Sequence, residues 1–199
     1  YNSSQENISN AQIQGQLNVL NESFRRLNSD IFSAPTVFRG SSQDPLIEFC
    51  LAKRDPYGNP TTGINRVYTG LSTFAVANPQ VDGMDLSLFQ SSAQGQDPWN
   101  PNEYLNIYVC NLHGNNGPPG SYEALMGVAF PDISIFPPSF PGKGAVVDYR
   151  AFGEINTATS PLFVVSNKGK TLVHEVGHWL GLSHPWHNFY TPAGCSSDS

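Results

Sequence analysis

Charge is scarce in this chain, since Asp, Glu, Lys and Arg together make up 13% of its 199 residues. Acidic residues outnumber basic ones by 16 to 10, and no run of basic residues occurs. Nucleic acids and anionic lipid surfaces are recognised by clustered Lys and Arg. We therefore expect neither a nucleic acid nor a membrane surface as a partner.

Long apolar runs are missing as well. A membrane-spanning helix requires about 18 or more consecutive apolar residues, and no segment approaches that length. Hydrophobic residues still make up 39% of the chain, which favours a globular protein over a disordered one. The 18 Gly and 16 Pro residues indicate many loops, and the length suits one domain over residues 1–199.

Cysteine is also rare, with Cys50, Cys110 and Cys195. An odd number leaves at least one thiol free or paired outside the chain. Cys50 and Cys110 both lie in strand-like segments, and two interpretations stay open for them: a disulfide, or two small buried thiols. A bridge that closes so long a loop would contribute on the order of 4 kcal/mol to stability.

Two segments have the periodicity of amphipathic helices. The first covers residues 9–28, where Ser9 is suited to cap the N-terminus and apolar residues recur every three or four positions. These apolar residues are Ile13, Leu17, Leu20, Phe24 and Leu27. The second covers residues 168–181. We expect the first helix to pack on a core without a chemical role.

Six other segments are rich in β-branched and aromatic residues and are bounded by turn residues, as is typical of β-strands. They cover residues 35–39, 45–53, 66–76, 104–112, 125–130 and 144–149. No internal repeat and no linker interrupts the chain. The pattern predicts a single α+β domain.

The second predicted helix contains the sequence HEVGHWLGLSH at residues 174–184, which has the pattern HExxHxxGxxH. At about 100° per residue, His174 and His178 lie one turn apart on the same helix face, with Glu175 at its edge. Neutral imidazole nitrogens bind Zn²⁺ at about 2.0–2.1 Å, and an i, i+4 pair can converge on one ion. The opposite arc is apolar, and we expect it to be buried; it holds Leu172, Val173, Val176, Trp179 and Leu180.

A third ligand is expected from beyond the helix. Gly181 can adopt the left-handed conformation that ends a helix and redirects the chain. His184, three residues later, can then return to the metal. Three protein ligands leave a fourth position open for water, which is the arrangement of a catalytic zinc site; a structural site would need a fourth protein ligand. The sequence therefore predicts one catalytic Zn²⁺ held by His174, His178 and His184.

The motif also predicts a reaction. Glu175 is the candidate general base: it takes a proton from the metal-bound water and later delivers it to the leaving amine. The pattern is specific because HExxH alone arises by chance far more often than HExxH followed by Gly181 and His184. His113 and His187 are interpreted as surface histidines and not as spare ligands.

HEVGHWLGLSH resembles the zinc site of the metzincin clan of metallopeptidases. Further blocks resemble the pappalysin-type family, which includes pregnancy-associated plasma protein-A. These blocks are LNVLNESFRRLNSD at 17–30, IEFCLAKRDPYGNPTTGINRV at 47–67, YLNIYVCNL at 104–112 and GAVVDYRAFG at 144–153. The resemblance implies a twisted mixed sheet with a backing helix and an active-site helix, endopeptidase activity, secretion and structural Ca²⁺.

The resemblance also implies how substrate binds. In such enzymes an extended peptide or protein segment adds as a strand to the lower edge of the sheet. By position, that edge strand is expected near Leu125–Phe130. The alternative is an ordinary edge strand without a binding role.

Two departures from the family pattern matter. Pro185 follows the third histidine, as in the serralysin branch of the clan, but the Gly/Asp-rich calcium repeats of that branch are missing. The methionines Met84 and Met126 both precede the zinc motif, whereas metzincins carry a methionine-containing turn after it. We therefore expect the C-terminal subdomain to be missing or truncated, with its segment lost or present as a separate partner chain. An unpaired Cys195 fits this expectation.

Two hypotheses about function follow. The leading one is a secreted zinc-dependent endopeptidase that uses Glu175. The alternative is a catalytically inactive, metal-stabilised binding domain that presents its cleft to a partner.

Overall fold

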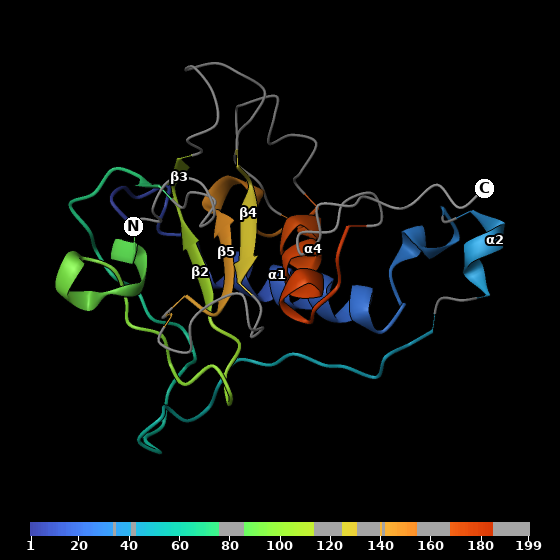
Figure 1. The fold of residues 1–199 in the computed structure, drawn as a ribbon, viewed down its shortest axis with the longest axis horizontal. Coiled ribbons are helices and arrows are strands. Elements are labelled where there is room, and N and C mark those ends of the chain that lie inside the picture. Colours follow the sequence, from blue (N-terminus) through green and yellow to red (C-terminus); the bar gives the residue numbers. More distant parts are fainter. Residues whose placement is uncertain are drawn as a thin grey trace.

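The computed structural model describes residues 1–33, 35–40, 43–75, 86–113, 125–130, 140, 142–154 and 168–184. Its centre is a three-stranded sheet with two helices packed against it, α1 (Asn10–Phe24) and α4 (Lys170–Trp179) (Figure 1). Short helical turns surround this centre: α2 (Thr36–Arg39), η1 (Ser29–Ser33), η2 (Leu86–Phe89), η3 (Ser91–Ala93) and η4 (Tyr149–Ala151). In the part of the chain described, no helix is both long enough and apolar enough to span a bilayer.

The sheet is mixed and has β5 (Gly144–Asp148) at its centre. On one side β2 (Ile107–Cys110) pairs in parallel with β5, and on the other β4 (Gly127–Phe130) pairs antiparallel. All five residues of β5 are buried, as expected for an apolar strand covered on both faces. A separate pair joins β1 (Phe74–Ala75) and β3 (Leu112–His113) in parallel. The predicted α+β architecture with a mixed sheet is confirmed.

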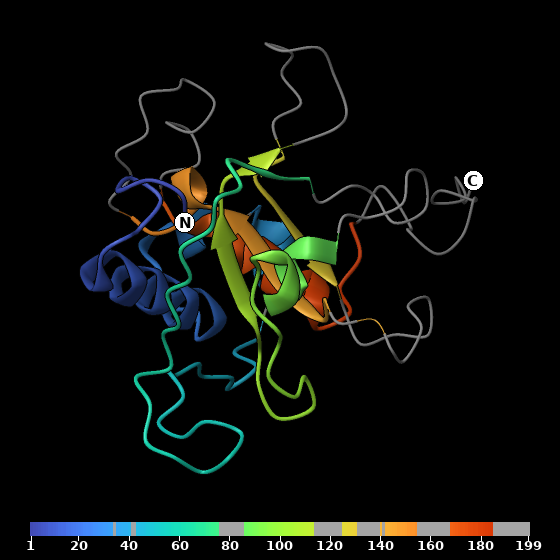
Figure 2. The ribbon, with the colours of Figure 1, turned by 90° about the vertical axis from the view of Figure 1, so that its left-hand side faces the viewer.

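The two faces of the sheet contribute to two hydrophobic cores. On one face, Val147 of β5 packs with residues of α1 and α4, including Leu20, Leu172 and Val176. On the other face, Val146 packs with η2 and with aromatic side chains such as Phe130. Figure 2 shows α1 and the short helices η2 and η3 on different sides of the sheet. The helix that carries the histidine motif thus packs against both the sheet and α1.

Helix α1 begins as predicted and ends earlier. The Ser9 hydroxyl accepts a hydrogen bond from the Gln12 N–H at 3.1 Å, which confirms the N-cap. The prediction that the helix continues to residue 28 is wrong, because Arg26 has φ 54° and the Leu27 N–H bonds back to the Glu22 carbonyl at 2.7 Å. This is the pattern of a left-handed helix end. Leu27, predicted on the apolar face, is 73% exposed.

Three strand predictions are wrong in whole or in part. Residues 36–39 form helix α2, and Pro35 just before it has a fixed φ that suits a helix start. The segment 45–53 forms no strand, because the Asn21 side chain binds both the N–H and the carbonyl of Phe49, at 2.7 and 2.9 Å, in place of a ladder. Within the described residues 66–75 only β1 forms, and Val67 and Thr69 bond instead to the backbone of Tyr1.

Candidate metal site

The N-terminus of α4 is fixed by a buried glutamine on α1. Gln16 is 1% exposed, and its amide nitrogen donates to the Gly169 carbonyl at 2.9 Å. Its amide oxygen accepts from the Gly153 N–H at 2.7 Å. Gly169 has φ 66° and directly precedes the helix. One side chain thus ties α1 to the start of the motif helix and to the turn after β5.

The C-terminus of α4 ends in the turn that the sequence predicts. Gly181 has φ 92°, and its N–H donates to the His178 carbonyl at 2.8 Å. The Leu182 N–H donates to the Gly177 carbonyl at 3.0 Å. These two bonds with a left-handed glycine form a Schellman motif. The chain therefore reverses after the helix, and His184 returns toward the helix face.

The three predicted ligands lie together. The Nε2 atoms of His174 and His178 are 2.9 Å apart, and each is 3.0 Å from Nε2 of His184. Together they are a group of side chains that could hold one metal ion. Since zinc–imidazole distances are about 2.0–2.1 Å, one ion can reach three nitrogens at this spacing, so the donor set fits zinc. Among the described residues, the cluster contains no fourth protein ligand that a structural zinc site would require.

The turn after α4 also orients a ligand. Nδ1 of His178 lies 2.6 Å from the Leu182 carbonyl oxygen. Because a carbonyl only accepts, Nδ1 carries the proton and Nε2 is left with its lone pair, directed at the other two histidines. Burial and the two neighbouring imidazoles lower the pKa of His174, which favours its neutral, metal-binding form.

Glu175, which the helical wheel places at the edge of the histidine face, is buried in the structure. It is 7% exposed, and this burial raises the pKa of Glu175 to about 8. Its side chain lies against β4, where a Cβ built on Gly127 would come within 2.9 Å of its Cγ. A bound divalent cation beside it would favour the charged carboxylate and act against the effect of burial.

The apolar side of α4 is buried as predicted, with one exception. Leu172 and Val176 are 1% and 0% exposed, and Val173 and Trp179 pack against the same core. Leu180 is 42% exposed, so the prediction that it is buried is wrong. It lies at the end of α4, where the left-handed turn at Gly181 carries the chain away from the core.

Among the described residues, neither Cys50 nor Cys110 belongs to this cluster. His113 is the last residue of β3, and Cys50 and Cys110 are both free thiols, the first exposed and the second buried. The structure thus holds no bridge between the two cysteines. Four other residues lie outside the described part of the chain: Met84, Pro185, His187 and Cys195.

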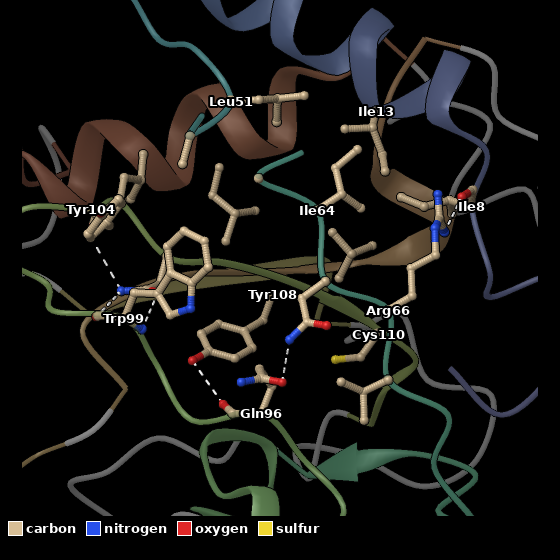
Figure 3. Close-up of a pocket in the computed structure, with 18 of the residues that line it drawn as sticks. Ile8, Ile13, Leu51, Ile64, Arg66, Gln96, Trp99, Tyr104, Tyr108 and Cys110 are labelled. Carbon is tan, nitrogen blue, oxygen red and sulfur yellow. Dashed lines mark hydrogen bonds between the residues drawn. The ribbon is translucent and has the colours of Figure 1, made fainter. Parts of the chain in front are cut away.

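A cavity of about 780 Å³ lies elsewhere, between α1, the segment 48–67 and β2. Figure 3 shows its apolar wall, with Ile13, Leu51, Ile64 and Trp99 turned toward one another. None of the residues that line it belongs to α4 or β4. This hollow is therefore not part of the candidate metal site.

Sequence reasoning missed three features of the site: the Leu182 carbonyl, the bridging side chain of Gln16 and the contact at Gly127. Only the last left a signal in the sequence, because a glycine inside a predicted strand often marks the close approach of another segment.

Comparisons with known proteins find similar solved structures. No protein-family model matches the chain, and no curated protein does either. Mirolysin in complex with compound 9 is 41% identical with a TM-score of 0.74, over 94% of this chain and 61% of that one. Mature mirolysin from Tannerella forsythia in complex with a cleaved peptide is 40% identical with a TM-score of 0.75, over 94% and 61%.

A promirolysin mutant from Tannerella forsythia gives the same picture, with 40% identity and a TM-score of 0.75 over 94% of this chain and 54% of that one. This chain thus spans less than two thirds of the chains it matches. Mirolysin is a metzincin-type zinc metallopeptidase, and the expected metzincin-like fold is confirmed. The likeness supports the metzincin clan and does not extend to the pappalysin type.

Proposed function

We propose that this chain is the catalytic part of a secreted zinc endopeptidase of the pappalysin type. The observation that carries the proposal is the convergence of His174, His178 and His184, whose Nε2 atoms lie within 3.0 Å of one another. The likeness to mirolysin supports zinc as the metal and peptide-bond hydrolysis as the reaction.

In this proposal the three histidines hold zinc and Glu175 moves the proton. Zinc, when bound, supplies a Lewis acid that polarises the scissile carbonyl and lowers the pKa of a water toward about 7. Glu175 adjoins His174 on the helix and is nearly free of competing solvent, so it can accept a proton from that water. The same carboxyl group then delivers the proton to the leaving amine.

The substrate is proposed to bind as an extended strand along β4. In the described sheet β4 is the outer strand beside β5, the position at which an extended peptide can add as a further strand. This edge belongs to the strand that touches Glu175. The cleaved peptide solved with mirolysin is consistent with a peptide substrate.

Four finer expectations belong to the proposal: secretion, the pappalysin type, structural calcium and a separate C-terminal partner segment. Secretion and the pappalysin type come from the sequence resemblance alone. Structural calcium has no candidate site in the described residues, where the histidine triad is the metal-ligand group. A separate C-terminal portion of the protein is proposed as the partner segment.

The decisive experiment replaces Glu175 by Gln, which keeps the size of the side chain and removes its basicity. We expect casein or gelatin hydrolysis to fall by about 10³-fold or more, since general acid–base groups contribute about 10²–10⁴-fold. Zinc content, measured by atomic absorption, should stay at one ion per chain. A chelator should stop hydrolysis by the unmodified protein, and added zinc should restore it.

The matched control is Glu22→Gln, because Glu22 is an exposed glutamate on α1. It should leave both hydrolysis and zinc content unchanged. Full activity of Glu175→Gln would show that another group is the base. An unmodified protein that binds zinc and hydrolyses no peptide would favour the inactive binding domain.

A further inference from the structure

Gly127 is a glycine inside a β-strand, where its own backbone gives no reason for it. It lies at the start of β4, opposite Val147 of β5. Its φ is outside the left-handed region, so other residues could adopt the same conformation. A glycine in a strand also weakens the strand. The reason for glycine therefore has to be the space around it.

That space is taken by α4. A Cβ at position 127 would lie 2.9 Å from Cγ and 3.1 Å from Oε1 of Glu175. It would also lie 3.1 Å from Cγ2 of Thr171, which is one helical turn before Glu175 and on the same face. Carbon atoms in van der Waals contact are about 3.5–4.0 Å apart. Any side chain at position 127 would therefore force the side chain of Glu175 to move.

The other residues of β4 also place small side chains on the face toward α4. Gly127 and Ala129 face β5 residues that belong to the core shared with α4. Val128 and Phe130 alternate with them and pack in the core on the opposite face. The face of β4 toward the helix is thus built from the two smallest residues, so the helix can approach the strand closely.

We propose that Gly127 is a positioning residue for Glu175. Because glycine has no side chain, position 127 leaves the space in which the Glu175 side chain lies, between the strand and Thr171. The carboxylate is thereby held next to the strand along which substrate is proposed to bind. The role of Glu175 as base rests on the proposed function, whereas the contact with Gly127 can be tested without any activity.

The test is a double-mutant cycle on stability in metal-free protein, kept free of metal with a chelator. Gly127→Ala is made in the unmodified protein and in a Glu175→Ala background, and thermal unfolding is followed by circular dichroism. We expect the variant to lower Tm by several degrees in the unmodified protein. In the Glu175→Ala background, where no Cγ opposes the new methyl group, the loss should be at most half as large.

Gly15→Ala is the matched control, since a Cβ there meets nothing within 4 Å. It should raise Tm, because alanine suits the helix interior better, and by the same amount in both backgrounds. An equal Tm loss for Gly127→Ala in both backgrounds would overturn the proposal. If Gly127→Ala alone does not fold, the double variant is expected to fold, and its failure would also contradict the proposal.

A kinetic measurement on zinc-loaded protein separates positioning from a general structural role. For Gly127→Ala we expect kcat to fall by about 100-fold, as for a misplacement of about 1 Å, with KM within about twofold. Zinc content should remain at one ion per chain. An unchanged kcat would overturn the positioning role. A total lack of hydrolysis by the unmodified protein would instead reject the proposed function. The double-mutant cycle on stability would still test whether position 127 contacts Glu175.

Discussion

The reactivity of a side chain in this fold depends on how deeply the backbone buries it, and the two described cysteines illustrate this. Cys110 lies in β2 and is 4% exposed, whereas Cys50 is exposed. Burial, with the nearby Asp148 carboxylate as a smaller cause, raises the pKa of the Cys110 thiol. Because the thiolate is the reactive form, Cys110 should be the inert thiol of the two.

Alkylation should therefore distinguish the two cysteines. In native protein at pH 8, we expect iodoacetamide to modify Cys50 and to modify Cys110 at least about tenfold more slowly. Peptide mass spectrometry assigns the sites, and a sample in denaturant provides the control in which both react. A non-reduced digest that contains a peptide pair linked through Cys50 and Cys110 would show that the bridge forms in solution.

The site residues themselves were the easiest to predict. His174, His178 and Glu175 lie within five consecutive positions, so helical geometry alone places them together. The return of His184 depends on Gly181, for which the sequence predicts a left-handed conformation and the structure has φ 92°. The position of Glu175 could not be predicted, because its burial comes from β4, which is 48 positions away in the chain.

At the scale of elements, α4 is held at its start by a contact that no local pattern predicts. Gln16 is 153 positions from Gly169 and 137 from Gly153, yet it binds both backbones. Strand predictions also failed because of contacts between segments that are distant in the sequence. The segment 45–53 has the composition of a strand, but the Asn21 side chain holds its backbone and no ladder forms.

Replacement of Gln16 by Leu tests how much this element-to-element contact stabilises the fold. The substitution leaves the Gly153 N–H and the Gly169 carbonyl without their partner in a buried place. We expect the free energy of unfolding to fall by about 2 kcal/mol, within the range for unsatisfied buried polar groups. Urea denaturation measures the change.

Gln14→Leu is the matched control for this measurement. Gln14 is exposed and bonds only locally, to Asn18. Its loss should change the free energy of unfolding by less than about 0.5 kcal/mol. Equal effects of the two variants would show that the buried bridge contributes nothing to stability.

At the scale of the whole molecule, the candidate site gathers parts of the chain that are far apart in sequence. The start of α4 depends on α1, its middle rests on β4, and its end is closed by its own turn. Stability and site chemistry are therefore linked through one buried carboxyl group. Glu175 binds its proton up to about pH 8 in the fold, against an ordinary pKa of 4.5.

This linkage has a definite sign in metal-free protein. Between about pH 4.5 and 8 the unfolded chain has already lost the Glu175 proton and the folded protein keeps it, so stability falls as pH rises. His174 acts in the opposite direction, because its folded pKa is lowered, but its contribution is complete above its ordinary pKa of 6.5. Above pH 6.5 the contribution of His174 therefore levels off, while that of Glu175 continues to change up to about pH 8.

Comparison of unmodified protein with Glu175→Gln over that interval tests the linkage. We expect the variant to be the more stable of the two by a margin that grows with pH, at up to about 1.4 kcal/mol per pH unit. Urea denaturation with a chelator present measures the margin, and groups common to both proteins cancel in the difference. Saturating zinc should make this margin in stability grow less with pH, since the cation favours the charged carboxylate. A constant margin in metal-free protein would mean that Glu175 is ionised throughout and is not desolvated by β4.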